Sequence, residues 1–178
     1  MTFGAIAVHA GVSKSGVVAH FSNADRLKAG IIARAVEVWG RACLVPAEGS
    51  SGLGELTRYL SRWISWTKRA GLPGGCPIAS AMFEYNYEGR SVRLAVATAE
   101  ARWREALVEL VEGAIAQSDF PGSVDPSQMA WNLLGIYLSH HVSCHCLRAT
   151  DADRKAQESV AQLIAFAKQP KSYPQRTR

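Results

Sequence analysis

Apolar residues recur at every third or fourth position through nearly the whole chain, and no segment alternates apolar with polar residues as a half-buried strand does. This spacing puts the apolar side chains on one face of an α-helix. The helices expected from it span residues 3–10, 14–21, 24–43, 53–70, 78–85, 91–117, 126–147 and 151–167. The sequence therefore predicts an all-α fold, and an apolar fraction of 48% is enough for a packed core.

The first two helices are short and are joined at Gly11, which predicts a helix-turn-helix. Thr2 and Ser13 precede them, and each hydroxyl can accept a hydrogen bond from a backbone N–H of the following helix. Gly11 suits the turn because glycine tolerates a positive φ. The second helix then begins at an exposed, partly positive end that suits phosphate oxygens and base edges in a major groove. We therefore predict a DNA-binding segment at the front of the chain.

Positive charge is concentrated at the two ends of the chain, whose net charge is +5. Residues 1–41 carry five basic and two acidic side chains, and the segment from Lys168 onward carries four basic side chains and no acidic one. Phosphate binding draws on local positive charge, so both ends are candidates for a nucleic-acid contact. The tail also contains Pro170 and Pro174, which favours a solvated, disordered end there.

The segment from Ile6 to Leu27 carries a specific pattern. It contains Ile-Ala-x-x-Ala-Gly-Val-Ser-Lys starting at Ile6, then His-Phe at 20–21, then Leu27. This pattern resembles the DNA-binding domain of the tetracycline repressor-like (TetR) family, and the resemblance covers about residues 2–41. The run Gly-Gly-Cys-Pro at 74–77 resembles, with less specificity, one subgroup of the ligand-binding and dimerisation body of that family.

The resemblance implies a division of the chain into two domains and a tail, and it implies a function. Residues 1–43 would be the helix-turn-helix domain, 44–168 the ligand-binding and dimerisation domain, and 169–178 a disordered basic tail. The protein would be a cytoplasmic repressor that forms a homodimer through its last two helices and binds a palindromic DNA operator. A ligand in the body would lower the affinity for that operator.

The resemblance also implies which residues meet DNA. The second helix, 14–21, would be the recognition helix, with its first residues at the DNA groove and further residues along the groove. The residue that caps the first, supporting helix would lie near a phosphate. These residues are Thr2, Ser13, Lys14, Ser15, Gly16, Ala19 and His20. The small core beneath them would consist of Ile6, Ala10, Val12, Val17, Phe21 and Leu27.

The chain departs from the family pattern in three places. Family members carry a helix before the position of Thr2, where this sequence has only Met1. An aromatic residue that contacts phosphate is expected where Val18 stands, and a lysine where Ala24 stands. Each lost phosphate contact lowers DNA affinity. An alternative function follows, which is a TetR-like dimer that binds a ligand or partner and whose DNA binding is weakened or lost.

Aromatic side chains on the body helices suggest a small apolar or aromatic effector. Pockets in helical bundles are largely apolar with a few polar groups, and a set of such rings fits that description. Taken singly, each ring is more typical of plain core. The predicted ligand-binding residues are Trp63, Trp66, Phe83, Trp103, Trp131 and Tyr137.

Histidine and cysteine gather near the end of the helix at 126–147. His140 and Cys144 share one stripe of that helix, and His141 and His145 share another. Such spacing can bind a transition metal when a further ligand arrives. The sequence shows no second ligand group, so we favour a helix–helix dimer contact and predict no metal and no cofactor.

Other functions find no support in the sequence. It contains no carboxylate pair, nucleophile triad or phosphate-binding loop, so we predict that the protein is not an enzyme. No apolar run is long enough to cross a bilayer and no secretory signal is present, so no membrane partner is expected. The four cysteines are then expected as reduced thiols, with Cys76 as a turn residue rather than a reactive group.

Overall fold

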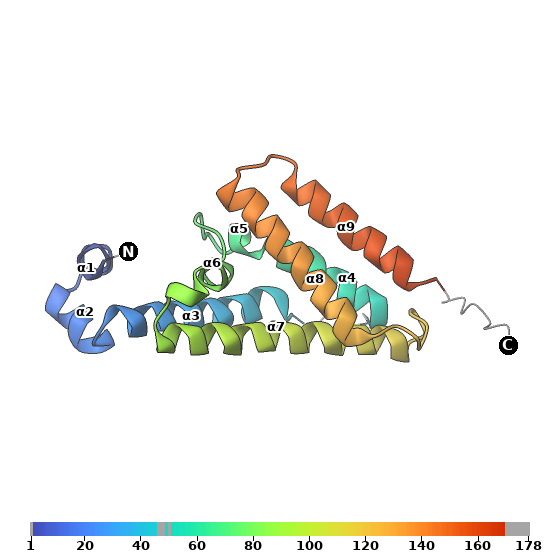
Figure 1. Ribbon diagram of the computed structural model, residues 1–178, viewed down its shortest axis with the longest axis horizontal. Helices are drawn as coiled ribbons and strands as arrows, with labels where there is room; N and C mark the ends of the chain where they lie inside the picture. Colours follow the sequence, from blue (N-terminus) through green and yellow to red (C-terminus); the bar gives the residue numbers. More distant parts are fainter. Residues whose placement is uncertain (1, 46–48, 50, 170–178) are drawn as a thin grey trace. The chain divides into compact units, whose positions relative to one another are not determined.

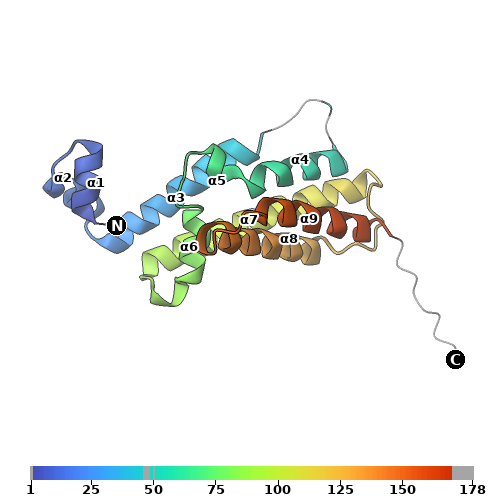
Figure 2. The ribbon, with the colours of Figure 1, turned by 90° about the horizontal axis from the view of Figure 1, so that it is seen from above.

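The structure is a computed structural model that describes residues 2–45, 49 and 51–169. Every regular element in these ranges is helical (Figures 1 and 2), which confirms the all-α prediction. The elements are α1 (Phe3–Ala10), α2 (Lys14–Phe21), α3 (Ala24–Cys43), α4 (Gly52–Ile64), α5 (Trp66–Arg69), α6 (Pro77–Phe83), η1 (Tyr85–Tyr87), α7 (Arg90–Ala116), α8 (Pro126–His141), η2 (Val142–Cys146) and α9 (Ala152–Ala167).

The chain divides into two compact units. The first unit consists of Met1–Val38 and Cys76–Ala101, and the second of Trp39–Gly75 and Arg102–Arg178. Helices α3 and α7 therefore contribute to both units. The predicted domain boundary at residue 43 stays a prediction, and the predicted tail lies almost wholly outside the described residues.

Two predicted helices differ from the observed ones. The helix expected over 53–70 is interrupted at Ser65, which has φ −115° and ψ 20° and separates α4 from α5. The Ser65 hydroxyl donates to the carbonyl of Ser61 at 3.5 Å, a local bond of the kind that bends helices. The helix expected over 126–147 is α-helical only to His141 and continues as the π-helical η2.

In the first unit, side chains cap α1 and α2 as predicted. The Thr2 hydroxyl accepts from the Ala5 N–H at 3.2 Å, and the Ser13 hydroxyl accepts from the Gly16 N–H at 3.0 Å. Gly11 ends α1 with φ +65°, the left-handed conformation that favours glycine. The helix-turn-helix is therefore defined by short-range hydrogen bonds that its own sequence supplies.

The start of α3 is bound to the start of α7, also within the first unit. The Asp25 carboxylate accepts from the backbone N–H groups of Ser91 at 3.0 Å and Val92 at 3.2 Å. Lys28 donates to both carboxylate oxygens of the buried Glu88, at 2.7 and 2.9 Å. Because Asp25 satisfies N–H groups that have no partner inside α7, it serves as a cap supplied by another helix.

These contacts predict a pH-dependent effect of Asp25→Asn. The hydrogen bond from the Ser91 side chain, helped by the two backbone N–H groups and by Arg93, lowers the pKa of the Asp25 carboxyl below its ordinary value. A lowered pKa stabilises the fold above about pH 4, and this stabilisation is lost as the pH falls further. We expect Asp25→Asn to lower the melting temperature at pH 7. Below about pH 4 the melting temperatures of the variant and the wild type are expected to become progressively more similar.

The matched control is Glu37→Gln, which makes the same chemical change on the same helix. Glu37 lies in an exposed ion pair with Arg34, a kind of pair that adds little stability. Thermal unfolding followed by circular dichroism from pH 3 to 8 measures both variants. A difference between Asp25→Asn and wild type that stays constant over this range would contradict the assigned role.

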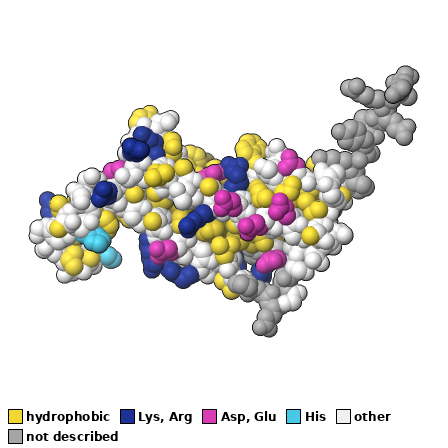
Figure 3. Space-filling view, turned by 90° about the horizontal axis from the view of Figure 1, so that it is seen from below, with side chains coloured by type: hydrophobic (Ala, Val, Ile, Leu, Met, Phe, Trp, Pro, Cys, Tyr) yellow, Lys and Arg dark blue, Asp and Glu magenta, His cyan; other side chains and the backbone are white. Residues whose placement is uncertain are grey.

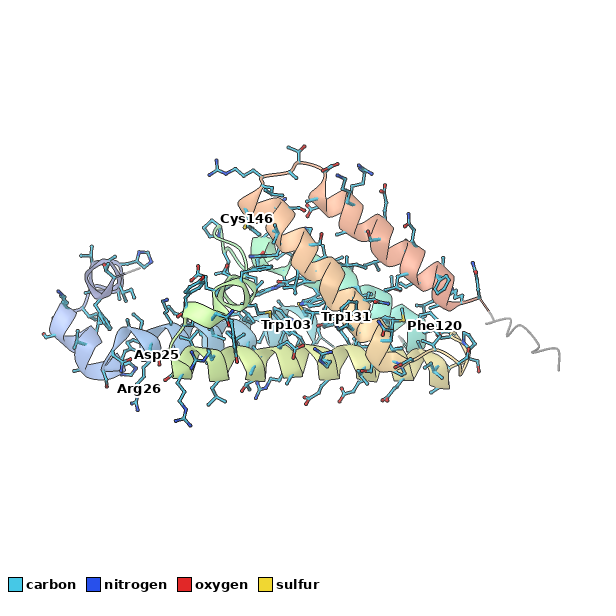
Figure 4. All side chains as sticks on the ribbon, in the orientation of Figure 1. Asp25, Arg26, Trp103, Phe120, Trp131 and Cys146 are labelled. Carbon is cyan, nitrogen blue, oxygen red and sulfur yellow. The ribbon has the colours of Figure 1, made fainter. Side chains whose placement is uncertain are left out.

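Aromatic rings fill the core of the second unit. The rings of Trp63 and Tyr137 stack with centroids 4.3 Å apart, and Trp103 meets both edge-on at 5.6 and 5.2 Å. The Trp66 indole N–H donates to the Tyr137 hydroxyl at 2.7 Å. Figure 4 shows Trp103 in the interior, between α7 and α8. This cluster joins α4, α5, α7 and α8.

Helices α8 and α9 pack side by side in the second unit (Figure 1). As predicted, Pro126 opens α8 behind Asp125, whose carboxylate accepts from the N–H groups of Ser127 at 2.9 Å and Gln128 at 3.1 Å. Figure 3, seen from the side of α7, shows acidic side chains gathered on the surface, and α7 exposes Glu105, Glu109 and Glu112. In the described ranges no helix has the length and apolarity needed to cross a membrane.

Candidate functional site

The predicted DNA-binding residues all lie on the exposed surface of the helix-turn-helix. Ser13 precedes α2, and its hydroxyl lies 3.1 Å from that of Ser15. The side chain of Lys14 is exposed at the first position of α2, about one and a half turns before the exposed Ala19 and His20. The start of α2 thus offers a lysine and two hydroxyls on one exposed end, next to backbone N–H groups that can bind an anion.

The core beneath α2 is smaller than the resemblance implied. Val17 and Leu27 are buried, and Phe21 lies against α3, where a Cβ at Gly30 would come within 3.3 Å of its ring. Val12, however, is 54% exposed, so its assignment to this core is wrong. The backbone explains the difference, because the Val12 N–H bonds to the Ala7 carbonyl just after the left-handed Gly11 and its side chain faces solvent. Ala10, also assigned to this core, is exposed too.

Two departures from the family pattern lie on the same surface. Val18 is partly exposed on α2, and Ala24 is exposed at the first position of α3. Neither side chain can donate a hydrogen bond to a phosphate oxygen. Lys14 on α2 and Arg26 on α3 are exposed basic groups of the same unit. The surface therefore carries part of the positive charge on which phosphate binding draws.

The six predicted ligand-binding aromatics have different surroundings. Four of them, Trp63, Trp66, Trp103 and Tyr137, are buried and pack on one another in the second unit. Trp131 on α8 is 61% exposed, and Phe83 on α6 of the first unit is 55% exposed. The four buried rings therefore already make contacts with each other, and their role toward a ligand stays a prediction.

A cavity of about 560 Å³ lies in the second unit. Its walls come from the end of α4, from α5 and the loop after it, from the end of α8, and from η2 and the start of α9. The lining residues are Ile64, Ser65, Thr67, Lys68, Gly71, Leu72, Pro73, His140, Cys144, His145 and Asp153. Its volume lies within the range of small-molecule sites, and its wall combines apolar groups with a few polar ones.

Three polar side chains converge on the wall of this cavity. His140 Nε2 lies 2.7 Å from Asp153 Oδ1 and 3.2 Å from Cys144 Sγ. The thiol lies 3.9 Å from the same carboxylate oxygen. Burial and then the charge of Asp153 raise the pKa of the Cys144 thiol, which argues against a reactive nucleophile. The sequence singled out His140 and Cys144 but did not indicate Asp153, which comes from the next helix.

The backbone around these side chains is unusual. Segment η2 is π-helical, with the Leu147 N–H bonded to the Val142 carbonyl at 3.0 Å. A Cβ at Gly75 would lie 2.6 Å from the His145 ring, and φ at Gly75 is +83°. Both the lack of space and the left-handed backbone therefore disfavour any residue other than glycine at this position. Burial, helped by His145 and His140, lowers the pKa of His141 to about 4, so this imidazole is neutral near pH 7. Single π-helical turns are frequent at functional sites.

These features define an all-α protein with an exposed helix-turn-helix in one unit and a helical body with a cavity in the other. Residues 52–160, more than half of the chain, match the model of the family described as "Tetracyclin repressor-like, C-terminal domain". The chain belongs to the tetracycline repressor-like (TetR) family.

A solved structure supports the fold over most of the chain. It comes from Rhodococcus sp. and is described as a candidate TetR-family transcriptional regulator. The TM-score is 0.70 with 21% sequence identity, and the match covers 92% of this chain and 87% of that one. A comparison with the curated proteins returns no match. The fold and the family of the chain are thus shown.

Proposed function

We propose that this protein is a ligand-responsive, DNA-binding transcription regulator that acts in the cytoplasm as a homodimeric repressor on a palindromic operator. The observation that carries the proposal is the exposed start of α2, where Ser13 caps the helix and Lys14 and Ser15 face solvent. Membership of the TetR family supports the same function. The DNA-binding residues remain those that the sequence predicts.

The surface of α8 and α9 supports a homodimer. Trp131 on α8 and Phe166 on α9 are 61% and 69% exposed. A groove of about 430 Å³ runs between the two helices, and several small residues line it, including Gly135, Ala152 and Ala156. Small residues let another helix approach closely, and large exposed apolar groups are costly in a monomer. A two-fold dimer would present two recognition helices about one DNA turn, roughly 34 Å, apart.

The cavity of the second unit supports ligand control. A ligand changes operator affinity when it binds one conformation of the dimer better than the other. The cavity has an apolar portion formed by Ile64, Leu72 and Pro73, which suits a small apolar or aromatic effector. Binding of such an effector would favour the conformation with lower DNA affinity.

Lys14→Ala tests the DNA-binding proposal directly. Removing one phosphate-directed lysine is expected to weaken binding to DNA from beside the protein's own gene by about tenfold and to reduce the salt slope, d log K/d log [salt], by about 1. Fluorescence anisotropy at several salt concentrations measures both. Arg102→Ala, which removes an exposed positive charge from α7 in the second unit, serves as the control and is expected to leave the slope unchanged.

An alternative function is a dimer of this fold that binds a ligand or partner and has weak or no DNA binding. Val18 and Ala24 favour it, because neither offers a phosphate contact. The same titration separates the two functions. Salt-sensitive binding by the wild-type chain supports the regulator, whereas the absence of such binding at low salt supports the alternative.

A further inference from the structure

We propose that His140, Cys144 and Asp153 bind a divalent transition-metal ion of the zinc type. The three donor atoms lie within 4.8 Å of one another, and they come from α8, η2 and α9, which follow one another in the chain. Imidazole nitrogen, thiolate sulfur and carboxylate oxygen are the donors that Zn²⁺ prefers in proteins. The proposal concerns a site separate from the DNA-binding surface.

The donor distances are close to those of a tetrahedral site. With metal–nitrogen and metal–oxygen bonds of about 2.0–2.1 Å and a metal–sulfur bond of about 2.3 Å, tetrahedral donors lie roughly 3.3–3.6 Å apart. In the structure these separations are 2.7 Å for nitrogen to oxygen, 3.2 Å for nitrogen to sulfur and 3.9 Å for sulfur to oxygen. Changes of roughly 0.1–0.6 Å in these separations would accommodate an ion, the largest of them between the nitrogen and the oxygen. The carboxylate of Asp153 is 55% exposed and is free to adjust.

Hydrogen bonds already draw these three side chains together, because the Cys144 thiol donates to the Asp153 carboxylate and the His140 ring nitrogen lies at hydrogen-bond distance from the same oxygen. His140 Nε2 faces both the Asp153 carboxylate and the Cys144 sulfur, and it carries either one proton or one lone pair. When His140 donates to Asp153 it cannot also accept from Cys144, so the 3.2 Å approach of nitrogen and sulfur then carries no hydrogen bond. A cation bound between the three atoms interacts favourably with all of them. His140 is buried, so it provides a fixed donor.

A tetrahedral ion held by these three side chains would have a fourth coordination position, and the cavity beside them could supply its ligand. His140, Cys144 and Asp153 line the cavity together with Thr67 and Lys68. Three protein ligands with a fourth position held by water or a bound molecule are typical of zinc sites that interact with small molecules. The ammonium group of Lys68 would favour an anionic donor at that position. The metal would also join η2 to α9.

Metal binding is tested on the full-length protein with Co²⁺ and Zn²⁺. The purified protein is treated with EDTA, desalted with a reductant and titrated with Co²⁺. We expect one Co²⁺ per chain, with visible bands of tetrahedral cobalt and a thiolate-to-cobalt charge-transfer band, both lost on addition of Zn²⁺. Cys144→Ser is expected to abolish the charge-transfer band and, like Asp153→Asn, to weaken Zn²⁺ binding by at least about tenfold.

Neighbouring residues provide matched controls. Cys146→Ser and Asp151→Asn make the same chemical changes two positions away from the proposed ligands, and both are expected to leave binding unchanged. Far-UV circular dichroism checks that each variant keeps its helical content. Absence of a stoichiometric cobalt complex, or a charge-transfer band that survives Cys144→Ser, would overturn the proposal. Neither readout involves DNA, so this failure differs from failure of the proposed function.

Discussion

Replacing Trp103 by alanine is expected to lower the free energy of unfolding by about 3–5 kcal/mol. The Trp103 side chain is fully buried on α7 and meets the rings of Trp39, Trp63 and Tyr137, at 6.3, 5.6 and 5.2 Å between centroids. Its removal loses the transfer free energy of the indole and leaves a cavity among side chains that belong to three other helices. Those helices cannot all move inward together, so little of the cavity collapses.

Urea unfolding followed by far-UV circular dichroism measures this loss, since tryptophan fluorescence changes with the substitution itself. Leu94→Ala is a useful control because Leu94 lies on the same helix but is largely exposed. We expect the control to change the free energy of unfolding by less than about 0.5 kcal/mol. A loss below about 1 kcal/mol for Trp103→Ala would contradict the close packing of aromatic rings described for the second unit.

The tryptophans show where sequence analysis reaches its limit. Trp103 and Trp131 both follow a helical spacing with other apolar residues, and both were predicted to bind a ligand. In the structure the first is fully buried and the second is mostly exposed. Helical periodicity identifies the apolar stripe of a helix but not what covers it. Burial depends on which helices pack together, and only the tertiary structure shows that packing.

Local features, by contrast, were predicted well. Each of Thr2, Ser13 and Asp125 accepts a hydrogen bond from an N–H group two or three residues along the chain, and such caps depend on short-range geometry. Val12 was misplaced because the orientation of its side chain depends on the dihedral angles of Gly11, which the residue type permits but does not fix. The break at Ser65 has the same origin, since serine is found both within helices and at their ends.

The residues of the proposed metal site could be predicted from the sequence only in part. The spacing of His140 and Cys144 places them on one side of a helix, and the sequence indicated that pair correctly. Asp153 lies thirteen positions after His140, beyond η2 and a turn that contains Arg148 at φ +53°. The path of that connection decides whether the carboxylate meets the imidazole. Sequence spacing gives no information on this path, so the third donor was missed.

Replacing Trp131 by alanine is expected to weaken the proposed homodimer strongly while leaving the fold of each subunit intact. A tryptophan at the centre of an interface contributes about 2–4 kcal/mol, which raises the dissociation constant about 30- to 700-fold. Trp131 fits that role because it is 61% exposed and borders the groove between α8 and α9. In a two-fold dimer the substitution occurs on both sides of the interface, so the effect is expected at the upper end of that range.

Sedimentation velocity from nanomolar to micromolar concentrations measures the dissociation constant. Tyr87→Ala provides the control, because Tyr87 is an aromatic residue that is even more exposed but lies in η1 of the first unit. Unchanged association of Trp131→Ala would place the interface elsewhere, and association lost equally in both variants would indicate non-specific contacts. Dimer loss confined to Trp131→Ala should also reduce operator affinity, because a monomer presents one recognition helix instead of two. The same substitution would then connect the exposed ring on α8 to the DNA-binding function proposed for α2.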